Sequence, residues 1–158
     1  MKHMHVVYPG SFDPPTLGHT SIVDRAKGLF DQVTVLIGVN PFKKPWLSVE
    51  DRFEILNKLF EKDDNVDVIC DSGLVAEAVN KLGARAIVKG IRSEKDLRSE
   101  QVMAEANSTI GHGLETLFLT SKGELQGVSS TLVRQIYQLG GDVSPFVPPI
   151  VSEWLKKT

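Results

Sequence analysis

The sequence lacks the features that would connect it with a membrane, a nucleic acid or an oxidising compartment. Cys70 is the only cysteine, so no internal disulfide can form. A formal net charge of −2 gives no general attraction to nucleic acid or to anionic lipid. No apolar run approaches the roughly 18 residues that a membrane-spanning helix needs, and the N-terminus offers no signal-peptide core. We therefore expect a cytoplasmic protein with no nucleic-acid or membrane partner.

Several catalytic motifs are also absent. The chain contains no G-x-x-x-x-G-K-[ST] phosphate loop, no H-E-x-x-H zinc pair, no G-x-S-x-G nucleophile turn and no G-x-G-x-x-G dinucleotide fingerprint. His3 and His5 stand together near the N-terminus without further ligands nearby, so we expect both to be surface residues rather than a metal site. The sequence therefore predicts no side chains dedicated to binding a metal.

What the chain does contain is a regular alternation of strand and helix patterns. The predicted strands cover 5–8, 32–39, 66–70, 84–88 and 114–120. The predicted helices cover 18–29, 49–60, 74–82, 93–110 and 129–139, with a last one starting at Pro148 and Pro149. Such alternation, without a linker or repeat, predicts one domain over residues 1–158: an α/β fold with a doubly wound, five-stranded parallel sheet of the Rossmann-like kind.

Apolar spacing within the helices predicts which side chains pack on the body of the protein. These are Ile22, Ala26 and Leu29 in the first helix, Phe53, Leu56, Leu59 and Phe60 in the second, and Trp154 and Leu155 in the last.

The turn from the first strand into the first helix, residues 8–19, is rich in Gly and Pro. It brings free backbone N–H groups and the positive end of a helix dipole to the carboxyl edge of the sheet, which favours an anion such as phosphate. Thr16 and His19 lie three residues apart across the helix start, so both can face that anion.

The other candidate charged segments also follow predicted strands, and they therefore meet at the same sheet edge. They are Lys43, residues 89–92, and residues 129–134, which end in Arg134. Cations and helix N-termini gathered in this way suit a polyphosphate substrate. Phosphoryl and nucleotidyl transfer need little from a protein beyond positioning and charge stabilisation.

The first turn, Gly10-x-Phe12-Asp13-Pro14-x-Thr16-x-Gly18-His19, resembles the first signature of the nucleotidyltransferase superfamily. The form with Thr, in a chain of this length, resembles the phosphopantetheine adenylyltransferase family. Three further segments resemble that family in the same order: Lys43-Lys44-Pro45, Lys89-Gly90-Ile91-Arg92 and Val128-Ser129-Ser130-Thr131-x-x-Arg134.

The resemblance implies transfer of the adenylyl group of Mg-ATP to 4′-phosphopantetheine by direct in-line displacement, yielding dephospho-coenzyme A and pyrophosphate in coenzyme A synthesis. It also implies Mg²⁺ as cofactor and a homohexamer. Catalytic roles fall on His19, Lys43 and Arg92. ATP binding falls on Ser11, Phe12, Thr16, His19, Gly90, Ile91, Arg92, Glu100, Leu125, Gln126, Gly127, Val128, Ser129, Ser130 and Thr131. Binding of the acceptor falls on Ser11, Lys43, Leu74, Val75 and Lys89.

The chain departs from the family pattern at three places: Leu97-Arg98-Ser99, Leu125-Gln126-Gly127, and Lys89 where arginine is common. Two alternatives stay open. One is another small-molecule nucleotidyltransferase, with nicotinamide mononucleotide or glycerol phosphate as acceptor. The other is a nucleotide-binding regulatory module without catalysis, for which the altered 97–99 segment is the support.

Overall fold

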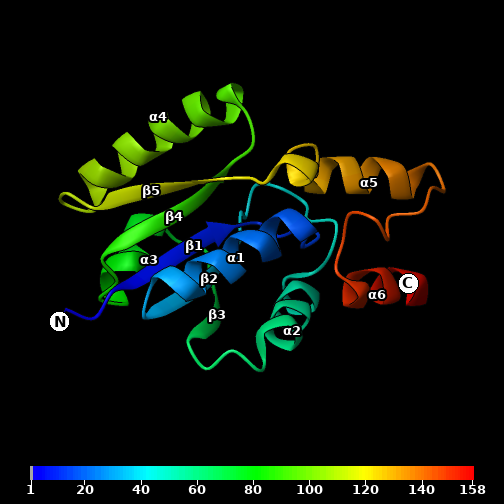
Figure 1. Cartoon of the computed structure of the whole chain (residues 1–158), viewed down its shortest axis with the longest axis horizontal. Helices are drawn as coiled ribbons and strands as arrows, with labels where there is room; N and C mark the ends of the chain where they lie inside the picture. The colour runs from blue at the N-terminus through cyan, green and yellow to red at the C-terminus, as the bar shows by residue number, and fades with distance from the viewer. Residues whose placement is uncertain (1) are drawn as a thin grey trace.

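The computed structural model describes residues 2–158 and contains one five-stranded, wholly parallel sheet in the order β3-β2-β1-β4-β5 (Figure 1). The strands are β1 (His5–Gly10), β2 (Gln32–Gly38), β3 (Val66–Asp71), β4 (Ala86–Ile91) and β5 (Glu115–Thr120). The helices are α1 (Leu17–Leu29), α2 (Val49–Phe60), α3 (Val75–Lys81), α4 (Glu94–Ile110), α5 (Ser130–Gln138) and α6 (Pro149–Lys157), with a short 3-10 turn, η1 (Gly123–Leu125). The predicted parallel sheet of five strands is confirmed.

Helices cover both faces of the sheet, as a doubly wound fold requires. On one face α1 and α2 pack on the central strands through a cluster that includes Ile22, Ala26 and Leu56. On the other face α3 contributes Ala76 and Val79 to a second cluster. Helices α5 and α6 lie beyond the carboxyl ends of the strands and join α2 in a third cluster, so they extend the wall of that edge (Figure 1).

β1 and β4 pair only near their amino ends, so their carboxyl ends are separated. The chain builds outward from β1 through β2 to β3 and then returns to place β4 on the other side of β1, which makes this the point where the strand order reverses. β1 pairs with β2 from His5 to Gly10, but it pairs with β4 only at Val6 and Val7. The carboxyl halves of the two central strands therefore flank a crevice.

Three strands run further than predicted at their carboxyl ends. β1 continues to Gly10 and β3 continues by one residue to Asp71. β4 continues to Ile91, because β5 pairs with β4 as far as the Ile91–Thr120 position. Lys89, Gly90 and Ile91 are therefore inside a strand rather than in the loop after it, and their backbone is fixed by the sheet.

Most of the predicted packing positions are confirmed, but two are wrong. Leu29, the last residue of α1, is 65% exposed, and Phe53 is 40% exposed. Phe53 faces outward because the preceding residue, Arg52, takes the inward position and is 3% exposed. Arg52 is stable there because its guanidinium donates to carbonyl oxygens of two loops. In α6, Leu155 is buried and Trp154 packs against the third cluster, as predicted.

The expectation for His5 is also wrong. Its ring is buried at the start of β1, and Nε2 lies 2.8 Å from Thr34 Oγ1 on β2. Burial lowers the pKa of His5, so the ring is neutral at physiological pH. His3 is exposed. Within residues 2–158, no group of three His, Cys, Asp or Glu side chains is arranged to hold a metal, and no helix has the length and apolar content to cross a membrane.

Candidate active site

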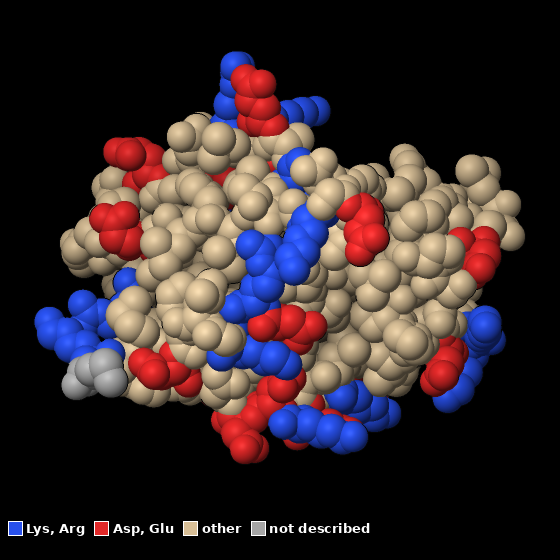
Figure 2. Space-filling model, viewed as in Figure 1, with Lys and Arg blue, Asp and Glu red and all other residues tan. Residues whose placement is uncertain are grey.

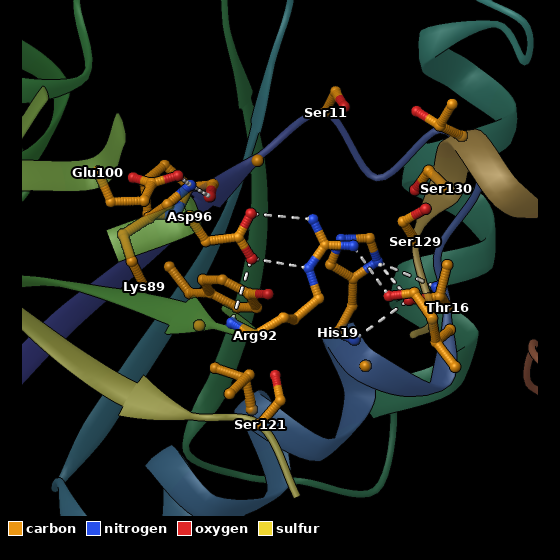
Figure 3. A pocket seen from close by; sticks show the side chains of 18 of the residues that line it. Ser11, Thr16, His19, Lys89, Arg92, Asp96, Glu100, Ser121, Ser129 and Ser130 are labelled. Carbon is orange, nitrogen blue, oxygen red and sulfur yellow. Dashed lines mark hydrogen bonds and ion pairs between the residues drawn. The ribbon is translucent and has the colours of Figure 1, made fainter. Parts of the chain in front are cut away.

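A cavity of about 300 Å³ lies at the carboxyl edge of β1 and β4, and all four of the predicted charged segments reach it. Figure 3 labels residues from three of them: the first turn, residues 89–92 and the start of α5. The predicted residues that line it are Ser11, Thr16, His19, Lys43, Lys89, Gly90, Arg92, Glu100, Val128, Ser129, Ser130, Thr131 and Arg134. Tyr8, Gly10, Asp96 and Ser121 also line it and were not among the predicted site residues. The tertiary structure therefore brings together segments that are more than 100 residues apart in the chain.

His19 is fixed by the turn in which it lies. Thr16 caps α1 and accepts from the main-chain N–H of His19 at 3.4 Å, while the main-chain N–H of Thr16 donates to His19 Nδ1 at 3.0 Å. In a neutral imidazole whose Nδ1 is an acceptor, the proton is on Nε2. His19 therefore offers the cavity an Nε2–H donor in a fixed ring orientation.

The surroundings keep this imidazole neutral. Burial, followed by the nearby positive charges of Lys89 and Arg92, lowers the pKa of His19 from 6.5 to about 3. The site therefore contains a neutral hydrogen-bond donor next to two cations. Such a donor can stabilise negative charge that develops on a phosphate oxygen without itself releasing a proton.

Arg92 is held from two sides, as Figure 3 shows for Asp96. Its Nε donates to Asp96 Oδ2 at 2.9 Å, and its Nη1 donates to the carbonyl oxygen of Val128 at 3.1 Å. Burial alone would raise the pKa of Asp96, but the hydrogen bonds from Arg92 outweigh it and lower the pKa. Arg92 keeps further N–H donors for a ligand. The signal for Asp96 in the sequence was its place four residues after Arg92 at a helix start capped by Ser93.

Lys89 and Glu100 form the wall between β4 and α4. Lys89 Nζ lies 3.5 Å from a Glu100 carboxylate oxygen and donates to the carbonyl oxygen of Pro9 at 3.3 Å, across the crevice between β4 and β1. Tyr8 lies at the base of this wall, and burial, reinforced by the Glu100 charge, raises its pKa. The Tyr8 phenol therefore stays protonated.

The start of α5 supplies hydroxyl groups that are already partly used. Ser129 Oγ accepts from the main-chain N–H of Leu132 at 3.1 Å, and Ser130 Oγ donates to the carbonyl oxygen of Pro14 at 2.8 Å. Arg134 Nη1 donates to the carbonyl oxygen of Asp13 at 2.6 Å. The first N–H groups of α5 have no partner within the helix and are the natural anion-binding groups of this wall.

Lys43 reaches the cavity from an exposed loop, residues 39–48, which we call the Lys43 loop. Lys44 lies beside it but lines only a neighbouring, wider hollow. Phe42, next to Lys43, is 97% exposed. The loop is anchored where it meets α2, because the Asp13 carboxylate accepts from the main-chain N–H groups of Trp46 and Leu47.

Seven predicted residues do not line this cavity, and one of them, Val75, lines a neighbouring cavity. Phe12 is 1% exposed, and its ring packs edge-on against His19, with centroids 4.8 Å apart. It supports His19 from behind. Ile91 is buried in β4, and Leu74 is the exposed residue before α3. Residues 125–127 lie in and after η1, outside the cavity.

Val75 lines a second cavity of about 240 Å³, which shares Pro9, Gly10, Lys89 and Glu100 with the first. Its other walls are mainly apolar and come from β4, α3 and α4, including Ile87, Met103 and Ala104. A charged cavity with an apolar extension suits a ligand that has a phosphate at one end and an uncharged arm at the other.

Charge is local rather than global. Basic and acidic side chains are interspersed over the face shown in Figure 2, with a short run of basic side chains near its centre. An anionic ligand would therefore be attracted by the groups that line the cavity and not by the field of the whole molecule.

Comparisons with known proteins agree with this geometry. Residues 7–136 match the family described as cytidylyltransferase-like. A phosphopantetheine adenylyltransferase of Methylobacillus flagellatus is 42% identical over 153 residues, 97% of this chain and 96% of the relative. One of Herminiimonas arsenicoxydans is 45% identical over 151 residues, 96% and 93% of the two chains.

The structural comparison supports the same fold. The crystal structure of a putative nicotinate-nucleotide adenylyltransferase from Vibrio parahaemolyticus aligns with a TM-score of 0.68, covering 99% of this chain and 93% of that one at 18% identity. At that identity the likeness concerns the fold alone. The near-complete coverage by relatives above 40% identity places the chain at a finer level: it belongs to the phosphopantetheine adenylyltransferase family.

Proposed function

We propose that this protein transfers the adenylyl group of ATP to 4′-phosphopantetheine and releases dephospho-coenzyme A and pyrophosphate. The observation that carries the proposal is the convergence of neutral His19, Lys43, Arg92 and the start of α5 on one cavity. The names of the relatives supply the acceptor and the nucleotide. The second, more apolar cavity beside the first supports an acceptor with an uncharged arm.

The reaction divides the site into two halves. A phosphate oxygen of the acceptor, held by Lys43, attacks the α-phosphorus of ATP, and the bond from that phosphorus to the pyrophosphate oxygen breaks. The His19 Nε2–H donates to an α-phosphate oxygen as charge builds on it. Arg92 and the first N–H groups of α5 bind the β- and γ-phosphates that leave. No covalent intermediate on the protein is needed, since positioning and charge stabilisation suffice.

The side chains fit an Mg²⁺ ion that arrives on the triphosphate rather than one held by a protein cage. Asp96 and Glu100, the acidic residues lining the cavity, are already paired with Arg92 and Lys89. Mg²⁺ commonly keeps most of its shell from water and substrate phosphates. When bound, it would neutralise charge on the phosphate oxygens.

We further propose that the protein is a cytoplasmic homohexamer. The supporting observation is α4, which has no fully buried residue and exposes Val102 (70%) and Met103 (53%). A helix with exposed apolar side chains of this size gains stability from burial against another subunit. Sedimentation of the purified protein tests the assembly.

The test of the reaction is pyrophosphate release from Mg-ATP with a panel of acceptors: 4′-phosphopantetheine, nicotinamide mononucleotide and flavin mononucleotide, and glycerol phosphate with ATP or CTP. We expect saturable release with 4′-phosphopantetheine alone. Release with another acceptor would overturn the substrate but keep the site chemistry. ATP binding without release from any acceptor would favour a regulatory module.

A further inference from the structure

The first loop of the site, residues 11–16, contains a buried carboxylate that takes no part in the proposed chemistry. Asp13 is 8% exposed, although an unpaired buried carboxylate is costly. Both of its oxygens are used on another loop: Oδ2 accepts from the main-chain N–H of Trp46 and Oδ1 from that of Leu47, each at 2.7 Å. Asp13 therefore joins the loop after β1 to the Lys43 loop.

A buried cation makes the reciprocal connection. Arg52, in the first turn of α2 just after the Lys43 loop, donates from Nη1 to the carbonyl oxygen of Ser11 at 2.7 Å. Its Nε donates to the carbonyl oxygen of Ser48 at 3.2 Å. Asp13 and Arg52 form no ion pair within 4 Å of each other among the residues the structure describes. Each charged side chain instead binds main-chain groups of the opposite segment: Asp13 accepts from N–H groups of the Lys43 loop, and Arg52 donates to the carbonyl oxygen of Ser11.

These contacts lie between the two halves of the proposed site. Ser11 and His19 belong to one segment and Lys43 to the other, and Lys43 itself is exposed and makes no side-chain hydrogen bond or ion pair that the structure records. The distance from Lys43 to His19 is therefore set by where the loops are joined. A misplacement of about 1 Å between reacting groups can reduce turnover about 100-fold.

We propose that Asp13 and Arg52 are positioning residues, which fix the Lys43 loop relative to the Ser11–His19 segment and so set the geometry in which the acceptor phosphate meets the α-phosphate. This inference rests on the proposed function. Neither residue lines the cavity that contains His19, although both line the neighbouring hollow that Lys43 also reaches. Their effect is on the step that needs both halves, and not on ATP binding, which needs only one.

The test uses Asp13→Asn, which keeps the size of the side chain but turns an NH₂ group toward a main-chain N–H. We expect kcat with 4′-phosphopantetheine to fall about 10- to 100-fold, while the Kd for ATP changes less than about threefold. Arg52→Met should act in the same direction. Arg52→Lys retains one donor and should recover part of the loss.

A matched control separates positioning from simple loss of stability. Val33→Ala removes volume from the fully buried amino end of β2, far from the carboxyl edge. This substitution should lower the melting temperature. At assay temperatures below the unfolding transition, kcat should stay within about twofold of the wild-type value. If the Asp13 and Arg52 variants behave like Val33→Ala, with kcat falling only as the melting temperature is approached, the positioning role is wrong.

Hydrogen exchange measures the same connection without any acceptor. Asp13→Asn and Arg52→Lys should speed exchange of the amides in 40–48, whereas Val33→Ala should not. If wild-type protein turns over no acceptor, the proposed function fails, and this exchange result still decides whether the two loops are joined as inferred. Unchanged protection of 40–48 in both variants would overturn the inference by itself.

Discussion

The loops that follow β1 and β2 differ sharply although the two strands are neighbours and end at the same edge. Residues 12–16 are all buried, whereas residues 40–45 are all exposed. The first loop orients His19 through the Thr16 cap and is tied to α5 by Ser130 and Arg134. The second presents Lys43 on an exposed segment that is held at its two ends, by the main-chain hydrogen bond from Val39 to Asp71 and by the Asp13 carboxylate at Trp46 and Leu47.

This difference in burial matches the roles proposed for His19 and Lys43. A donor that acts on charge developing in the transition state must be in place beforehand, because reorganisation during the reaction is costly. A lysine that collects an incoming phosphate works from a mobile stem, as a point charge with three donors. Four changes test the division, from the largest expected effect to the smallest.

His19→Ala should give the largest effect. Removing one preorganised donor to the transition state costs about 100-fold or more in kcat. We expect that loss with little change in melting temperature, measured by pyrophosphate release and by thermal unfolding. His3→Ala, which changes an exposed histidine at the opposite edge of the sheet, is the control and should be neutral. Near-normal turnover of His19→Ala would remove the buried loop from the chemistry.

Lys43→Ala should lower kcat/KM for the acceptor about 10- to 100-fold, because the lost charge contacts the phosphate in the ground state and in the transition state. The Kd for ATP should change little. Lys44→Ala is the matched variant and should cost only a fewfold, since Lys44 does not line the cavity of His19. Equal losses in the two variants would mean that the loop acts by its net charge and not through Lys43.

Acid should lower the free energy of unfolding through His19, which the buried loop holds in place. The folded-state pKa of His19 is about 3, against 6.5 for an ordinary histidine, so its contribution is complete above pH 6.5. Between pH 6.5 and 3 the unfolded chain binds a proton that the folded protein does not, and stability falls as the pH falls. His5, whose pKa is also lowered, adds to the same slope.

Urea unfolding at pH 7.5 and pH 5 measures this effect. The loss of stability between the two pH values should be smaller in His19→Gln than in wild type, since glutamine does not titrate. An identical loss in the two proteins would show that His19 titrates normally. The pH dependence of wild-type turnover should show no inflection near pH 6.5 caused by His19, because the folded-state pKa of that ring is about 3.

Phe42→Ala should have the smallest effect. Phe42 is 97% exposed, and substitutions at such positions usually change the free energy of unfolding by less than about 0.5 kcal/mol. Phe12→Ala is the matched change in the buried loop, where loss of a core aromatic costs about 3–5 kcal/mol. A loss of acceptor affinity in Phe42→Ala would show that the Lys43 loop closes over its ligand. The contrast between a buried loop and an exposed loop would then not hold in the bound state.

Local patterns in the sequence were sufficient to predict most of the helices and strands of this protein and most of the segments that form its site. Periodicity and caps predict the helices and strands, and the rule that parallel strands share a carboxyl edge brings Ser11, His19, Lys43, Arg92 and Ser129 together. Errors arose where a neighbour remote in sequence decides the outcome. Phe53 was predicted to be buried because its spacing placed it on the apolar stripe of α2, but Arg52 takes the inward position to reach the carbonyl of Ser11, 41 residues away.

By itself, then, the sequence determined the alternation of elements, the parallel sheet and the set of segments at its edge, since these follow from periodicity and chain direction. Only the tertiary structure decided the burial of His5 against Thr34, the lowered pKa of His19 beside Lys89 and Arg92, and the connection of Asp13 with Trp46 and Leu47. Each of these depends on a partner about 30 residues or more along the chain. Such partners act through distance and dielectric environment, which folding alone sets.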